Sequence, residues 1–120
     1  MAYVDGFIVA VPKKNIVAYR KMSIACGKIW REYGALDYRE WVAEDVKVGK
    51  FTSFPRSVKL KPGETVVFAW ITYKSRAQRD RINAKVMKDP RLDEMMDPKS
   101  KPPFDGKRMI FGGFESLVKA

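Results

Sequence analysis

The segment Glu64–Tyr73, with the sequence ETVVFAWITY, restricts the fold more than any other part of the chain. It has the length of a β-strand and is rich in the β-branched and aromatic residues that strands favour. Phe68 and Trp70 point to one face of such a strand, and apolar residues also fill most of the other face. The segment 3–11 has the same two-faced apolar character. Such strands predict a sheet that is covered on both faces.

Six periodic segments are predicted in the order strand, helix, strand, strand, helix, strand, at residues 3–11, 16–33, 35–43, 64–73, 76–88 and 107–117. Gly34 fits the left-handed cap that ends the first helix, and Ser75 with Gln78 forms a capping box for the second. Asp89-Pro90 predicts the start of a further short helix. The irregular segment 44–63 has room for one short helix, and a polar linker is expected at 97–103.

This order of elements is that of the ferredoxin-like βαββαβ arrangement of the α+β class. Right-handed crossovers place both helices on one face of a four-stranded antiparallel sheet, which leaves the other apolar face bare. Soluble monomers rarely expose so large an apolar patch. We therefore expect a homodimer that packs sheet against sheet, a dimeric α/β barrel in which residues 1–120 form a single domain.

The chain contains no histidine and one cysteine, Cys26. These counts exclude Ser-His-Asp chemistry, histidine-based metal sites and an internal disulfide, so we expect neither a metal nor a cofactor. Cys26 lies in the apolar stripe of the first predicted helix without a basic neighbour, which favours a packing role over a nucleophilic one. No apolar run is long enough for a membrane span and no basic leader precedes one, which predicts a cytoplasmic location.

Five stretches together resemble one family, namely YVDGFIVAVP, EDVKVGK, ETVVFAWITY, KDPRLDE and PFDGKRMIFGGFE. They resemble the YbaA-like proteins, a family of uncharacterised bacterial proteins within the dimeric α/β-barrel, ferredoxin-like superfamily. The resemblance covers nearly the whole chain. It implies the fold and the dimer but carries no activity and no catalytic residues, since one fold hosts many functions.

The leading functional hypothesis is a cofactor-free small-molecule site, binding or enzymatic, between the sheet and the helices or at the mouth of the dimer barrel. The candidate ligand-binding residues are Tyr3, Phe7, Trp41, Trp70, Arg108 and Phe111. The candidate catalytic residues are the carboxylates Asp5, Glu40 and Glu115. An unpaired carboxylate within an apolar strand is costly. Asp5 is therefore expected at the strand's exposed end, paired with a basic residue such as Arg108, or poised for acid–base chemistry.

Two alternatives remain beside the small-molecule hypothesis. The net charge of +10 permits nucleic-acid binding, and RNA-recognition domains share this strand order. However, VVFAWITY lacks their basic-glycine lead, and the cations recur at spacings typical of exposed helix faces, so this alternative is the less favoured. A regulatory or structural dimer that acts through a partner protein is the other alternative, with residues 44–63 as its surface.

Gly112 and Gly113 stand side by side in the last predicted strand. Phosphate-binding glycines follow a strand and open a helix, so this pair does not fit that role. In a ferredoxin-like sheet the last strand pairs with the first. The two missing side chains therefore predict either room for a neighbouring aromatic ring or a β-bulge.

Overall fold

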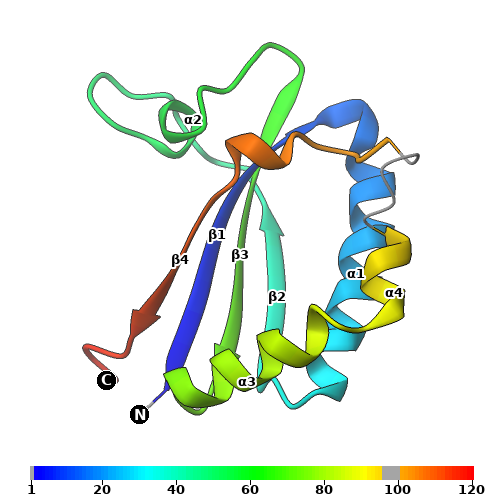
Figure 1. The fold of residues 1–120 in the computed structure, drawn as a ribbon. Coiled ribbons are helices and arrows are strands. Elements are labelled where there is room, and N and C mark those ends of the chain that lie inside the picture. Colours follow the sequence, from blue (N-terminus) through cyan, green and yellow to red (C-terminus); the bar gives the residue numbers. More distant parts are fainter. Residues whose placement is uncertain (1, 96–100) are drawn as a thin grey trace.

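The computed structural model describes residues 2–95 and 101–120 and consists of one antiparallel sheet with its longer helices on one face (Figure 1). The strands are β1 (Tyr3–Pro12), β2 (Asp37–Val42), β3 (Glu64–Tyr73) and β4 (Ile110–Glu115). The helices are α1 (Ile16–Glu32), α2 (Phe54–Ser57), α3 (Arg76–Val86) and α4 (Pro90–Met95), with 3₁₀ turns η1 (Lys13–Asn15) and η2 (Gly106–Arg108). The spatial order β2-β3-β1-β4 confirms the predicted ferredoxin-like fold, and the sheet of one chain stays open.

Most predicted element boundaries agree with the structure, because the local signals are strong. The strand predicted at 64–73 is β3 without change, and the amide of Gln78 donates to Ser75 Oγ at 3.1 Å as the capping box requires. Asp89 caps α4 by accepting from the Arg91 amide at 2.8 Å. The expected linker at 97–103 falls partly outside the described residues.

The last strand was predicted to begin at residue 107 and is shorter than expected, beginning at Ile110. Its first residues form η2 instead, in which contacts outside the β1–β4 pairing hold the Arg108 guanidinium. It donates to the Glu64 carboxylate at 2.7 Å and to the carbonyl oxygens of Val58 and Lys59 at 2.8 Å. These contacts tie the turn before β4 to the first residue of β3 and to the segment that precedes it.

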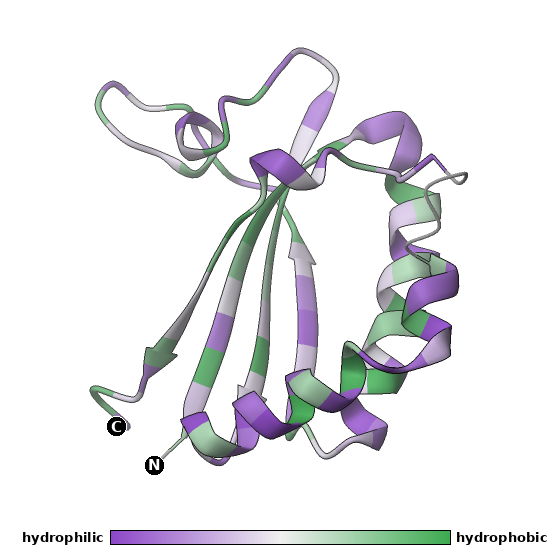
Figure 2. Ribbon diagram, in the orientation of Figure 1, coloured by the Kyte–Doolittle hydropathy of each residue, from purple (hydrophilic) through white to green (hydrophobic). Residues whose placement is uncertain are grey.

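The main core lies between the sheet and the helices α1 and α3. Alternate residues of β1 and β3 point into it, as the two-residue period of a strand requires. Its buried members are Val9, Val11, Tyr19, Ile29, Ala35, Val67, Ile71, Tyr73, Ile82, Val86 and Leu92. Figure 2 shows polar residues interrupting the apolar ones along α1 and α3, which is the pattern of helices that cover one face of a sheet.

The opposite face of the sheet is covered only at one end. There the segment around α2 buries a small cluster formed by Ala10, Val58 and Val66, and this segment projects away from α1 (Figure 1). The remainder, here called the bare face, carries Trp41, Phe68, Ile110 and Phe114 with exposed fractions of 48%, 40%, 41% and 65%. The sequence pattern predicted this uncovered apolar surface.

The paired glycines of β4 make room for aromatic rings of the same sheet. Gly113 lies opposite Asp5, next to Tyr3, and a Cβ at Gly113 would lie 2.1 Å from the Tyr3 hydroxyl oxygen. Gly112 pairs with Gly6, and the ring of Phe114 lies over both, 3.8 and 3.6 Å from the Cβ positions. The β1–β4 register runs on without a bulge from Tyr3 to Ile8, so the glycines serve packing.

Gly113→Ala is expected to lower the free energy of unfolding by about 1 to 3 kcal/mol, since the new methyl group displaces the Tyr3 ring. When Tyr3 is already replaced by alanine, Gly113→Ala should lower the free energy of unfolding much less, because the obstructing ring is gone. Gly106→Ala is the control, with no atom within 4 Å of its Cβ position. Denaturant titration of the four-member cycle measures the coupling, and additive costs would contradict this interpretation.

Candidate functional site

Three hydroxyl groups converge on the Glu40 carboxylate between α1 and β2. Tyr38 and Glu40 are two residues apart on β2 and therefore face the same side, toward α1. Tyr19 and Ser23 are four residues apart on α1 and therefore share one helix face. The Tyr19 hydroxyl donates to Glu40 Oε1, and the hydroxyls of Ser23 and Tyr38 donate to Oε2, the latter at 3.2 Å. We call these four residues the Glu40 cluster.

The electrostatics of the Glu40 cluster keep its tyrosines protonated. Burial raises the pKa of Tyr19 far above its ordinary value, and the negative charge of Glu40 raises it further. The pKa of Tyr38 is raised by the same two causes in the same order. Both phenols therefore act as hydrogen-bond donors. A carboxylate offers about four acceptor positions, and side chains of the described residues fill three of those of Glu40.

The Glu40 cluster stands between two hollows. An outer groove of about 700 Å³ runs between α1 and the edge strand β2, and its walls include Ile16, Arg20, Ile24, Lys28, Trp41 and Val42. An inner cavity of about 120 Å³ lies between the helices and the sheet, among Phe7, Met22, Cys26, Trp30, Trp70 and Ile71. Tyr19, Tyr38 and Glu40 line both. A molecule in the groove would therefore reach the free side of the carboxylate.

Gly27 allows α1 to pass close to this part of β2. A Cβ at Gly27 would lie 2.9 Å from the Tyr38 ring, closer than real Cβ contacts come. The same ring lies beside Trp30, with ring centroids 6.3 Å apart. A glycine inside a helix costs about 1 kcal/mol relative to alanine. The close approach of Tyr38 is the structural reason for this glycine.

The structure places Asp5 in an ion pair, as one of the sequence readings expected, but with a different partner. Arg79 Nη1 of α3 lies 2.6 Å from Asp5 Oδ1. Arg108, the basic partner suggested from the sequence, binds Glu64 instead. The Tyr3 ring lies under the Arg79 guanidinium, 4.9 Å from ring centroid to Cζ. Asp5, Tyr3 and Arg108 thus have structural partners and do not line the outer groove or the inner cavity.

The remaining predicted site residues fall into separate places. Phe7 borders the inner cavity on the same side of the sheet as Glu40. Trp41 borders the outer groove and Trp70 the inner cavity, but both side chains point with Phe68 to the bare face, where their ring centroids lie 5.5 Å apart. Phe111 stacks on Phe7 at 6.3 Å and is 69% exposed. Glu115 lies with Tyr3 at a third hollow of about 510 Å³, far along the sheet, near Ser75 and Arg76.

Sequence reasoning singled out Glu40 but missed its partners. Tyr19 and Ser23 fall, like Cys26, in the apolar stripe of the first predicted helix, which indicates a packing role, and the sequence pattern does not single out Tyr38. The signals were present, since a serine interrupts that stripe four residues after a tyrosine, and Tyr38 precedes Glu40 by two in a strand. The sequence does not specify that the helix face carrying Tyr19 and Ser23 packs against the strand that carries Glu40.

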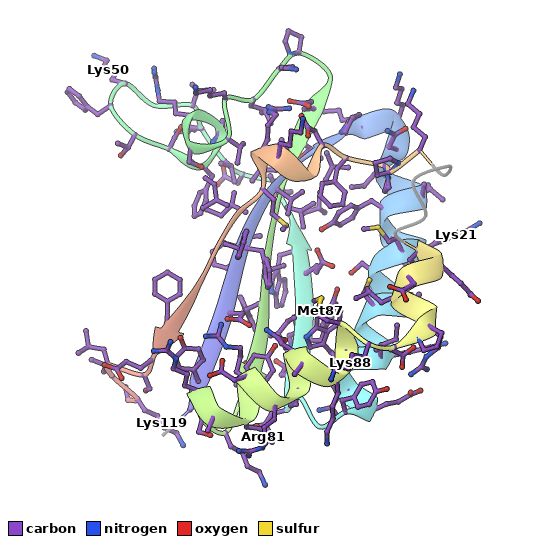
Figure 3. The ribbon with its side chains drawn as sticks, in the orientation of Figure 1. Lys21, Lys50, Arg81, Met87, Lys88 and Lys119 are labelled. Atoms are coloured by element: carbon purple, nitrogen blue, oxygen red, sulfur yellow. The ribbon has the colours of Figure 1, made fainter. Side chains whose placement is uncertain are left out.

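Other features of the described residues limit the chemistry further. Within residues 2–95 and 101–120, no three histidine, cysteine, aspartate or glutamate side chains gather closely enough to hold a metal ion. No helix in this part of the chain combines the length and apolar character needed to cross a membrane. Lys21, Lys50, Arg81 and Lys88 project outward from different elements (Figure 3), which agrees with the predicted scatter of positive charge.

The thiol of Cys26 is expected to react slowly in the folded chain. Burial, aided by the charge of Glu40, raises its pKa from 9.0 to about 11. Because the thiolate is the nucleophile, this shift lowers the reactive fraction at about pH 8 by roughly 100-fold. Alkylation by iodoacetamide, followed by mass spectrometry, should therefore be much slower than for the urea-unfolded chain. Equal rates in the two states would contradict the protected position of Cys26.

Comparison with known proteins identifies relatives over the full length of the chain. A family described as "Protein of unknown function (DUF1428)" matches residues 2–106. The uncharacterised protein YbaA of Escherichia coli K12 is 49% identical over 118 residues, which covers 98% of each chain, and the same holds for YbaA of Shigella flexneri. Among solved structures, Rv0793 of Mycobacterium tuberculosis aligns over 100% of this chain and 99% of its own, with a TM-score of 0.56 and 15% identity. That likeness concerns the fold alone.

Proposed function

Because this chain belongs to the DUF1428 family, whose function is unknown, we propose its function from the site itself: it binds a small organic molecule in the outer groove, and Glu40 accepts a hydrogen bond from that molecule. The observation that carries this proposal is the Glu40 carboxylate, which three hydroxyl donors fix in place at the wall of the groove. Fixed polar groups in a mostly apolar hollow are how small-molecule sites achieve orientation.

The chemistry of the groove suits a ligand with an apolar body and one polarised N–H or O–H group. Apolar side chains such as Ile16, Ile24 and Val42 line its walls. The donor group of the ligand would occupy the acceptor position of Glu40 that the chain leaves free. Tyr19 and Tyr38 stay protonated and donate to the Glu40 carboxylate, which leaves Glu40 to act as a hydrogen-bond acceptor toward the ligand.

A ligand screen tests this proposal. Small phenols, aromatic amides and lactams should include a compound that raises the melting temperature; at 100 times its dissociation constant it adds about 2.7 kcal/mol of stability. Glu40→Gln keeps the size of the side chain but removes the charge, and should weaken binding about 10-fold or more.

Glu44→Gln is the matched control for this screen, since Glu44 is exposed and lies outside the groove lining. It should bind like the wild type. Binding that is equally strong in the wild type and in Glu40→Gln would exclude Glu40 as the acceptor. A panel without any compound that depends on Glu40 would argue against the small-molecule function as a whole.

The proposal includes a homodimer formed through the bare face. β2 and β4 each have six residues and extend about 20 Å, and four strands span roughly 15 to 20 Å, so the uncovered part of the face is on the order of 300 to 400 Å² in projection. Trp41, Phe68 and Phe114 stand out from this face and add accessible area toward the roughly 800 Å² that a standard interface buries per partner. A second copy is the natural occupant, because an apolar face of aromatic residues is complementary to itself across a two-fold axis. The outer groove opens on the helix side of the sheet and shares the edge-strand residue Trp41 with the bare face, so such a dimer leaves the α1 wall of the groove accessible.

A second candidate function is binding of a partner protein through residues 44–63. The observation that favours it is Phe51, which is 90% exposed in a segment that Arg56 fixes by donating to the carbonyl oxygens of Val48 and Gly49. A cellular phenotype abolished by Phe51→Ser, with groove affinity unchanged, would favour this function. A cytoplasmic location and the absence of nucleic-acid binding stay predictions from the sequence.

A further inference from the structure

We infer that the outer groove selects organic anions: its ligand carries a carboxylate or a comparable acidic group that binds Arg20 and Lys28, in addition to the donor group that binds Glu40. This inference rests on the proposed small-molecule function and specifies its ligand class. The observation behind it is the distribution of charge along the groove.

The charged residues of the groove are arranged in two groups. Arg20, Lys28 and Arg31 of α1 contribute three positive charges, and Asp37 and Glu40 of β2 contribute two negative ones, which leaves the lining with a net charge of +1. Helix-borne cations therefore form one wall, and the Glu40 carboxylate of β2 faces them from the other. The net charge of +10 on the whole chain adds a long-range attraction for anions.

Several of these charges are already used within the chain. Arg31 donates to the carbonyl oxygen of Ala35 at 2.7 Å and to that of Leu36, and Asp37 pairs with Arg39 at 3.0 Å. Arg20 and Lys28 are exposed, and neither pairs with a carboxylate within residues 2–95 and 101–120. These two are the cations that a ligand can engage.

The helix places these two cations on either side of the Glu40 cluster. Arg20 precedes Ser23 by three residues and Lys28 follows it by five, which corresponds to about 4.5 and 7.5 Å along the helix axis. Ser23 itself touches Glu40. A ligand whose hydroxyl binds Glu40 therefore reaches either cation with an acidic group at its far end, and its apolar middle lies along Ile24.

Para-hydroxycinnamate provides a matched set of probes for this arrangement. It has a hydroxyl and a carboxylate at opposite ends of a flat apolar body. Its methyl ester lacks the negative charge, and cinnamate lacks the hydroxyl. Calorimetric titration into the wild type should give the tightest binding for para-hydroxycinnamate, with about a 10-fold loss for the ester. Added salt should weaken the binding of the acid and leave the binding of the ester unchanged.

Arg20→Gln combined with Lys28→Gln should abolish the preference for the acid over the ester. Lys21→Gln removes a neighbouring cation that projects outward from α1 and does not line the groove (Figure 3), so it should keep that preference. Glu40→Gln should reduce the advantage of para-hydroxycinnamate over cinnamate. All these side chains except Glu40 are exposed, so folding is expected to be unaffected.

The outcomes separate the two proposals. If the ester binds as well as the acid and depends on Glu40, the anion inference is wrong and the groove function stands. If the Arg20/Lys28 variant keeps the preference for the acid, the carboxylate is bound elsewhere and the inference is also wrong. If neither acid nor ester binds in a manner that depends on Glu40 while another compound of the screen does, the anion inference is wrong and the groove function stands. If no compound of the screen depends on Glu40, the proposed function itself fails, and the inference with it.

Discussion

Arg79→Leu is expected to lower the free energy of unfolding by about 3 to 5 kcal/mol, because it leaves the Asp5 carboxylate buried without a counter-charge. The two side chains are 18% and 9% exposed, and their charged atoms lie 2.6 Å apart. The substitution also removes the cation that stacks on the Tyr3 ring. Denaturant unfolding followed by circular dichroism measures the loss.

Two further variants isolate the buried charge as the cause. Arg76→Leu removes an arginine of the same helix whose 4.0 Å contact with Asp80 is largely exposed, at 73% and 59%, and should cost less than about 1 kcal/mol. Asp5→Leu combined with Arg79→Leu removes both charges and should recover much of the lost stability. A double variant as unstable as Arg79→Leu alone would show that packing, and not the unpaired carboxylate, accounts for the loss.

The fold was predictable because its signals are local. The β3 segment, the Ser75 cap and the helix stop at Gly34, which has a φ of +112°, can each be read from a few neighbouring residues. The C-terminal strand was predicted too long for the opposite reason. Arg108 is drawn out of the strand by Glu64, 44 residues away, and no local pattern contains that contact.

The site was predictable only in part, because its partners are distant in the sequence. Glu40 could be singled out as a charged residue in a strand, but Ser23 lies 17 residues before it on a helix whose rotation the sequence does not specify. The partner of Asp5 was open for the same reason, since Arg79 is 74 residues away and Arg108 carries the same charge. Sequence periodicity determines which face a side chain occupies, and only the packing of the elements decides which side chains meet.

Phe68→Lys is expected to convert the proposed dimer into a monomer. Phe68 lies on the bare face, 40% exposed, with its ring 5.7 Å from those of Trp70 and Phe54. In a two-fold interface the substitution occurs twice, so two ammonium groups enter one apolar contact. The desolvation and repulsion should weaken association by about 3 kcal/mol or more, roughly 150-fold. Light scattering should give twice the chain mass of 13.8 kDa for the wild type and 13.8 kDa for the variant.

Met87→Lys is the control that tests whether dissociation depends on where the new charge lies or only on the added charge. Met87 is also an exposed apolar residue, at 58%, but it lies beyond α3 on the helix side of the molecule (Figure 3). Both variants raise the same net charge by one, so general repulsion between chains would affect them equally. Dissociation by Phe68→Lys with an intact Met87→Lys dimer therefore locates the interface on the bare face. A wild type that scatters as a single chain, or a dimer that survives Phe68→Lys, would mean that this face is not the interface between two copies.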